Sequence, residues 1–279
     1  MEPLLKASDL AILNTPEGRL RLLSAAILAP VVIAVLCLGG AAYAGLIMLV
    51  MGAGLYEWLR LVDDEAPQTD RYALFAVLVL ILLLAAADLP VFGLIALAIG
   101  TAAFYAHRSN IEPMRAYWFA LGLPYMAGSG IACIYLRATP AIGFKVSIYL
   151  VAVVWGMDIG GYVVGKLVGG PKLAPAISPG KTWSGFIGGM ALAMILALIV
   201  LLMTGAHAYV TGLFLAIVLA AFAQGGDLFK SFFKRRAGVK DSGTLIPGHG
   251  GVLDRIDGLV FAAMVLGFLQ AVFGSRMIW

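Results

Sequence analysis

Long apolar runs constrain this chain more than any other feature. The chain is 62% hydrophobic and only 12% charged, whereas soluble domains are about 45–50% apolar and about 25% charged. A helix needs roughly 20 apolar residues to cross a bilayer. Nine stretches are candidate spans: 21–38, 41–59, 72–88, 90–106, 117–136, 146–165, 185–204, 208–228 and 257–275. We therefore expect an all-α, polytopic integral membrane protein with about nine transmembrane helices.

The positions of the Lys and Arg residues support this number of spans. If the N-terminus is cytoplasmic and the spans alternate, all of the 19 Lys and Arg residues except Arg137, Lys145 and Arg276 fall on the cytoplasmic side. This distribution follows the positive-inside rule. We expect 21–38 to be a true span and not a cleavable signal, since no small-residue cleavage site stands at its boundary. The net charge of +4 is spread over loops and predicts no nucleic-acid partner.

The chain divides into two parts by its polar content. Residues 1–140 form a transmembrane scaffold and a candidate homodimer face, because the first four spans contain almost nothing ionisable. Residues 141–279 contain the polar clusters in and near the spans, so we expect the catalytic region there, with its loops on the cytoplasmic side.

The first polar cluster lies in the sixth span. Asp158, Tyr162 and Lys166 are spaced i, i+4, i+8 and share one helix face. An aspartate inside a span costs about 2.5–3.5 kcal/mol on insertion scales, which favours a functional role. The alternative is an ion pair that locks two helices together. Nearby glycines, Gly160, Gly161 and Gly165, predict close approach of another helix.

The second cluster precedes the seventh span. Ser178, Lys181 and Thr182 offer donors for a phosphate group. The Gly180-Lys181-Thr182 run is not a P-loop, because Pro175 stands where that motif needs glycine. The alternative for this loop is an ordinary positively charged flank of a span.

The third cluster is the segment 227–257, between two apolar spans. Asp227 closes the eighth span, and Asp254 and Asp257 lie one helical turn apart at the start of the ninth. Carboxylates that hold a hard cation and bases that hold phosphate indicate phosphoryl or nucleotidyl transfer. A solvated loop with helix-capping aspartates is the alternative. For His249, a structural hydrogen bond is nearly as well supported as a phosphate contact.

These residues resemble the signature of the phosphatidate cytidylyltransferase family, over roughly 150–265. The signature joins a serine, two basic residues, a Lys-Asp pair, a glycine-rich turn and Asp-Arg-x-Asp. In this chain it reads Ser231, Lys234-Arg235, Lys240-Asp241, Pro247-Gly-His249-Gly-Gly251 and Asp254-Arg255-Ile-Asp257. Asp158-Ile-Gly-Gly-Tyr162 and Ser178-Pro179 with Lys181-Thr182 also resemble family motifs.

The resemblance implies a multi-pass enzyme of the cell (inner or plasma) membrane that makes CDP-diacylglycerol and pyrophosphate from CTP and phosphatidic acid. It implies Mg²⁺ as cofactor, with a second metal or an added monovalent cation left open. The implied metal ligands are Asp227, Asp254, Asp257 and Asp241. The implied catalytic residues are Asp227, Asp254, Lys240 and Asp241. The implied substrate-binding residues are Ser178, Lys181, Thr182, Ser231, Lys234, Arg235, His249, Arg255, Asp158 and Tyr162.

One position departs from the family pattern. Lys230 stands where the family commonly has glutamate. If that acid binds metal or positions a base in relatives, this chain lacks it. The run Asp254 to Gly258 superficially resembles the Asp-Gly motif of a second enzyme class, the CDP-alcohol phosphotransferases. Those enzymes need further aspartates at helical spacing, and 259–274 carries no charge, so this reading fails. The non-enzyme alternative is an ion-coupled transporter that uses Asp158 and Asp227.

Overall fold

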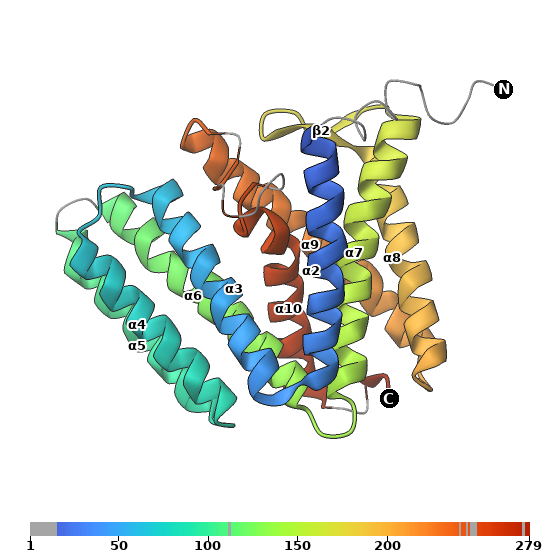
Figure 1. Cartoon of the computed structure of the whole chain (residues 1–279), viewed down its shortest axis with the longest axis horizontal. Helices are drawn as coiled ribbons and strands as arrows, with labels where there is room; N and C mark the ends of the chain where they lie inside the picture. The colour runs from blue at the N-terminus through green and yellow to red at the C-terminus, as the bar shows by residue number, and fades with distance from the viewer. Residues whose placement is uncertain (1–15, 111–112, 240, 244, 246–249, 275–276) are drawn as a thin grey trace.

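The computed structural model describes the chain apart from residues 1–15, 111–112, 240, 244, 246–249 and 275–276, and apart from the side chains of 16–25. In this described part the fold consists of nine helices and one small hairpin (Figure 1). The helices are α2 (Pro16–Leu38), α3 (Gly40–Val62), α4 (Gln68–Ala86), α5 (Pro90–Ser109), α6 (Pro113–Ala138), α7 (Gly143–Val168), α8 (Trp183–Met203), α9 (Tyr209–Arg236) and α10 (Leu253–Phe273).

Eight of these helices, α3 to α10, are long and apolar enough to cross a membrane. The apolar part described for α2, Ala26–Leu38, is shorter. The expected all-α polytopic membrane fold is therefore confirmed. Many large apolar side chains, such as Val210 and Phe214 of α9, are exposed on the helix surfaces, as a lipid environment requires.

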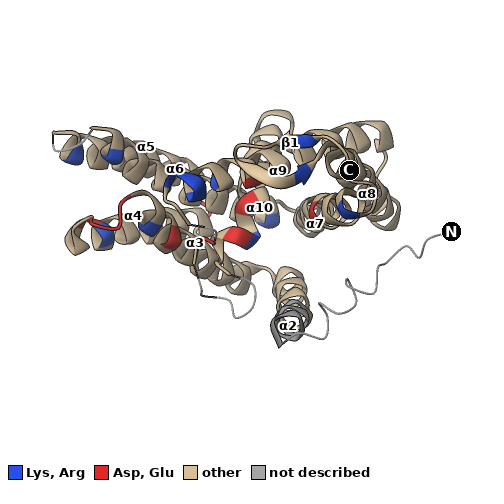
Figure 2. Ribbon diagram, turned by 90° about the horizontal axis from the view of Figure 1, so that it is seen from above, with Lys and Arg blue, Asp and Glu red and all other residues tan. Residues whose placement is uncertain are grey.

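Successive helices run in opposite directions, so the connections alternate between the two ends of the bundle (Figure 1). The segments 63–67 and 169–182, the C-terminus of α9 and the N-terminus of α10 consequently lie at the same end. Figure 2 looks onto the bundle from above and shows acidic residues in α10 near the middle of this end, with Lys and Arg on the helices around them. Arg137 and Lys145 flank the α6–α7 turn at the opposite end, as the alternation of spans predicts.

The contact between α7 and α8 depends on glycine. A Cβ atom on Gly160 would lie 2.7 Å from the Gly188 carbonyl oxygen, and one on Gly189 would lie 2.6 Å from the Met157 carbonyl oxygen. The helix backbones therefore touch, as the glycines in the sixth span predict. At the N-terminus of α8, the Thr182 hydroxyl accepts a hydrogen bond from the Gly185 amide at 3.1 Å.

The segment before α8, which was expected to be a loop, forms a two-stranded antiparallel hairpin. Its strands are β1 (Lys172–Ala174) and β2 (Ser178–Thr182). Ala174 pairs with Ser178 and Lys172 with Thr182. The hairpin sets the side chains of Ser178 and Lys181 at fixed positions beside the end of α9, where a free loop would leave them mobile.

An aromatic cluster joins the two parts of the chain. Trp58 of α3 stacks on Phe229 of α9 with ring centroids 5.9 Å apart, and it also contacts Phe233 and Tyr125. Phe261 of α10 packs against Phe229 at 5.4 Å. Aromatic pairs of this kind stabilise packing by about 0.5–1.5 kcal/mol each beyond their buried area. The N-terminal helices therefore support the face of α9 that points away from the charged residues.

The α7–α8 contact generates a stability prediction. We expect Gly160→Ala to lower the free energy of unfolding by about 1–3 kcal/mol, because its Cβ meets backbone atoms that cannot rotate away. The measurement is thermal unfolding of the purified protein in detergent.

Gly52→Ala is the matched control, since a Cβ at this helical position in α3 has open space around it. We expect it to leave stability unchanged or to raise it by up to about 1 kcal/mol. Equal stability of the two variants would contradict close packing of α7 on α8.

Candidate functional site

A polar cavity of about 530 Å³ lies among α7, α8, α9, α10 and β2. Its wall combines acids, bases and small residues from segments far apart in the sequence. The residues that line it are Met157, Asp158, Gly161, Tyr162, Gly165, Lys166, Ser178, Gly180, Lys181, Thr182, Gly185, Phe186, Gln224, Asp227, Lys230, Asp254, Arg255 and Asp257. All three sequence clusters therefore meet in one cavity.

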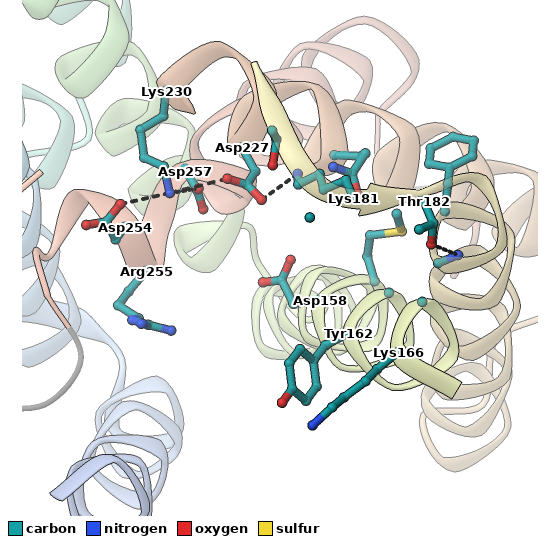
Figure 3. A pocket seen from close by; sticks show the side chains of 18 residues that line it. Asp158, Tyr162, Lys166, Lys181, Thr182, Asp227, Lys230, Asp254, Arg255 and Asp257 are labelled. Atoms are coloured by element: carbon teal, nitrogen blue, oxygen red, sulfur yellow. Dashed lines mark hydrogen bonds and ion pairs between the residues drawn. The ribbon is translucent and has the colours of Figure 1, made fainter. Parts of the chain in front are cut away.

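Lys230 lies at the centre of the acidic side of this cavity (Figure 3). Its Nζ atom is 3.3 Å from Oδ1 of Asp227 and 3.1 Å from Oδ1 of Asp254, and it forms an ion pair with Oδ2 of Asp257. The side chain is only 4% exposed. The expectation that Asp227 and the Asp254/Asp257 pair are two sides of one site agrees with this geometry, and a lysine joins them.

Close packing of α9 on α10 makes this arrangement possible. A Cβ atom on Gly226 would overlap the carbonyl group of Asp257. Only glycine therefore lets α9 approach α10 at the turn that carries Asp227. On α10, Asp254 and Asp257 are one turn apart, so both carboxylates reach the same ammonium group.

Asp254 also organises the polypeptide that precedes α10. Its Oδ1 atom accepts a hydrogen bond from Lys234 Nζ at 2.7 Å. Its Oδ2 atom accepts hydrogen bonds from the amide and hydroxyl of Ser242, both at 2.9 Å, and from the Gly251 amide at 3.3 Å. Asp241 is exposed. It lies near Asp254, because both side chains are within 4 Å of a Cβ built on Gly250.

Asp227 connects α9 with the hairpin. Lys181 Nζ of β2 is 2.5 Å from Asp227 Oδ2, and the Ser231 hydroxyl donates to Asp227 Oδ1 at 3.4 Å. Arg235, one turn further along α9, donates a hydrogen bond to the carbonyl of Ile177 at 3.2 Å. Arg235 therefore ties α9 to the hairpin and is absent from the cavity wall.

The opposite wall comes from α7. Asp158 points from α7 into the cavity toward Asp227 and Lys181, while Tyr162 and Lys166 follow on the next turns (Figure 3). The Lys166 Nζ atom lies 5.8 Å from the centre of the Tyr162 ring. Arg255 of α10 also lines the cavity. The predicted residues Lys240 and His249 lie outside the described residues.

The predicted magnesium ligands do not form an open metal site in this arrangement. Aspartate oxygens are suitable ligands for Mg²⁺, but the carboxylates of Asp227, Asp254 and Asp257 all face the Lys230 ammonium group. No group of three or more His, Cys, Asp or Glu side chains within the described ranges is placed to hold a metal ion. The assignment of these acids as metal ligands stays a prediction.

Glu57 is a site residue that sequence reasoning missed. This carboxylate of α3 is 1% exposed and accepts hydrogen bonds from the amides of Val252 at 3.0 Å and Leu253 at 2.8 Å. The Ser242 hydroxyl, whose single proton is shared with Asp254, lies 3.2 Å from it. Glu57 thus holds the first turn of α10, where helix amides need acceptors. The available signal was an acid inside the predicted span 41–59.

Gln224 is a second such residue. Its side-chain nitrogen is buried, lines the cavity and has no hydrogen-bond partner among the described residues. A buried amide without a partner is costly, so it is a candidate donor to a bound substrate. Its position between apolar residues at the end of the predicted span 208–228 was the signal.

Comparison with known proteins shows the family of the chain. A model described as the cytidylyltransferase family matches residues 19–273. Proteins named phosphatidate cytidylyltransferase from Brucella suis biovar 1 and Brucella abortus biovar 1 are each 48% identical over 158 residues, which is 57% of this chain and 58% of the relative. One from Staphylococcus haemolyticus is 43% identical over 151 residues, 54% of this chain and 58% of the relative. The chain therefore spans less than two thirds of the relatives' length in these alignments.

The position of Glu57 generates a prediction. We expect Glu57→Ala to lower the free energy of unfolding by about 1–3 kcal/mol, because the buried amide of Leu253 and the partly buried amide of Val252 lose their acceptor. Chemical unfolding of the purified protein in detergent is the measurement.

Glu65→Ala is the control, since this acid pairs with Arg115 but its side chain is 85% exposed. We expect a change within about 0.5 kcal/mol. A similarly small change in Glu57→Ala would show that Glu57 does not anchor α10.

Proposed function

Because the chain belongs to the cytidylyltransferase family, we propose that it transfers the cytidylyl group of CTP to phosphatidic acid, with CDP-diacylglycerol and pyrophosphate as products. The observation that carries this proposal is the single cavity into which acids of α7, α9 and α10 and bases of β2, α7 and α10 project. The cavity belongs to a bundle of membrane-spanning helices. A site of this kind suits a reaction between a water-soluble nucleotide and a membrane lipid.

The bases of the cavity are suited to the charge that the reaction moves. In the proposed step, an oxygen of the lipid phosphate attacks the α-phosphorus of CTP. A new P–O bond forms, the bond to the β-phosphate bridging oxygen breaks, and pyrophosphate leaves with the electron pair. Lys181, Lys166 and Arg255 line the cavity and are the cations for the triphosphate and the lipid phosphate. Fixed cations that face developing negative charge lower the barrier of phosphoryl transfer.

No strong general base is required in this mechanism. A phosphate monoester carries between one and two negative charges near pH 7, so the attacking oxygen is already an anion. The structure must instead hold two anionic substrates in line and offset their repulsion. Asp227 and Asp254 serve this purpose by orienting Lys181, Lys230 and Lys234.

The remaining predicted residues keep narrower roles. Ser178, Asp158 and Tyr162 line the cavity and are proposed substrate contacts. Thr182 lines it as well, but its hydroxyl caps α8. Ser231 and Lys234 support Asp227 and Asp254. Lys240 and His249 remain proposed contacts to phosphate, and Asp241 remains a proposed metal ligand.

Magnesium remains a proposal as well. Mg²⁺ commonly binds through substrate phosphates with only one or two protein carboxylates, so we propose that it enters with the triphosphate of CTP. The attack of the lipid phosphate on CTP is described through the residues of the chain and not through Mg²⁺. Titration with Mg²⁺ and with monovalent cations measures how many metal ions take part and whether a monovalent cation is among them.

The orientation of the chain in the membrane and its assembly are further proposals. The chain is a multi-pass membrane protein. We propose that the end with the cavity faces the cytoplasm of a cell (inner or plasma) membrane, because most Lys and Arg residues lie at that end in the alternating arrangement. A homodimer through the N-terminal helices also stays a proposal.

The transporter alternative has less support. An ion-coupling acid must exchange its counter-ion, yet Asp227 is held by Lys181 at 2.5 Å and by Lys230 at 3.3 Å. Of the two acids that the transporter alternative needs, only Asp158, on the α7 wall of the cavity, is left as a candidate for ion coupling.

Asp254→Asn tests the proposed reaction. We expect the variant to elute as a folded protein and to release pyrophosphate from CTP and phosphatidic acid at least about 100-fold more slowly, because Lys230 and Lys234 lose a shared charged partner. The assay measures pyrophosphate and CDP-diacylglycerol in detergent with added Mg²⁺.

Asp64→Asn is the control, because Asp64 is an exposed acid at the same end of the bundle and outside the cavity. It should keep wild-type turnover. If the wild-type protein released no pyrophosphate but moved ions across liposome membranes, the transporter reading would replace this proposal.

A further inference from the structure

The ammonium group of Lys230 lies among three carboxylates, those of Asp227, Asp254 and Asp257 (Figure 3). It donates a hydrogen bond to Asp257 and lies within ion-pair distance of the other two. Two of the carboxylates come from α10 and one from α9. The side chains of Lys230, Asp254 and Asp257 are only 4%, 8% and 7% exposed, so solvent contributes little to their neutralisation.

The pattern of ion pairs gives Lys230 a role that its neighbours do not share. Asp227 also has Lys181, and Asp254 also has Lys234. Within the described ranges, Lys230 is the one Lys or Arg that forms an ion pair with Asp257. A buried carboxylate that loses its partner is strongly destabilising. Lys230 is therefore the cation on which the charge balance of the buried acids depends.

From this geometry we propose that the Lys230 ammonium group is the resident cation of the acidic centre and takes the place that the aspartate motif would assign to a metal ion. In the nucleotide-free protein, the three carboxylates then bind no divalent cation. Mg²⁺ has near-ideal octahedral geometry and ligands at about 2.0–2.1 Å, so it would have to displace the ammonium group and leave it buried without a partner. A divalent cation reaches the site only as part of the nucleotide complex.

This inference deepens the proposed function, since it names the internal cation of the same cavity. Its test uses no substrate, so its failure is distinguishable from failure of the proposed reaction. Mn²⁺ is the probe, because it binds oxygen ligands and its binding is measurable by electron paramagnetic resonance.

The experiment compares Mn²⁺ binding by the full chain in detergent, without nucleotide, for the wild type and three variants. We expect no stoichiometric site in the wild type. We expect one site in Lys230→Met, with an affinity at least about tenfold higher than any wild-type binding, because removal of the ammonium group frees three charged ligands. The double variant Lys230→Met with Asp254→Asn should lose this site.

Lys234→Met is the matched control. It removes a lysine one turn along the same helix that contacts the same Asp254 carboxylate at 2.7 Å, but it leaves Lys230 in place. We expect it to bind no Mn²⁺. Stoichiometric Mn²⁺ binding by the wild type, or by Lys234→Met as tightly as by Lys230→Met, would overturn the proposal, as would absence of binding in folded Lys230→Met.

Thermal unfolding covers the case in which Lys230→Met is unstable. We expect its melting temperature to be lower than that of the wild type and to rise when Mn²⁺ is added, while the wild-type value stays constant. If the variant folds under neither condition, the wild-type titration decides alone. Stoichiometric binding then refutes the proposal, and its absence supports it.

Discussion

The ion pairs between Lys230 and three aspartates are the interaction on which the rest of the structure depends. Charges buried in a helical bundle must be paired, because the free-energy cost of removing a charge from water is large unless an oppositely charged group compensates it. Lys230 pairs with Asp227, Asp254 and Asp257, and among the described residues it is the one ion-pair partner of Asp257. This pairing brings α9 against α10, and Gly226 provides the space. The cavity follows, since Asp227 in turn holds Lys181 and the hairpin.

The N-terminal helices are part of this arrangement and are not only a scaffold. Glu57 of α3 accepts hydrogen bonds from the first amides of α10 and shares the hydroxyl of Ser242 with Asp254. Trp58, the next residue, packs on the aromatic side chains of α9. A single turn of α3 thus positions both helices that carry the acids. The polar content of the sequence, which separates 1–140 from 141–279, does not indicate this link.

Much of the fold and part of the site could be predicted from local pattern. The lengths of the apolar runs predicted the helices, since a helix must satisfy its own backbone in a bilayer. The i, i+3 spacing of Asp254 and Asp257 and the i, i+4 spacing of Asp158 and Tyr162 placed these pairs on shared faces. The hairpin was not predicted, because its strands are only three and five residues long and the longer one contains proline and glycine. Glu57 was missed because its partners are backbone amides almost 200 residues away.

The sequence by itself determined that the chain spans a membrane, where its helices lie and which residue types are available for chemistry. It did so because hydrophobic length, charge placement and helical periodicity are properties of neighbouring residues. Only the tertiary structure decided which charges meet. Lys230 and its three acidic partners, Asp227, Asp254 and Asp257, come together through packing of α9 on α10. The strength of an ion pair depends on distance and burial. A lysine that reads in sequence as the loss of an acid is, in three dimensions, the centre that holds the remaining acids.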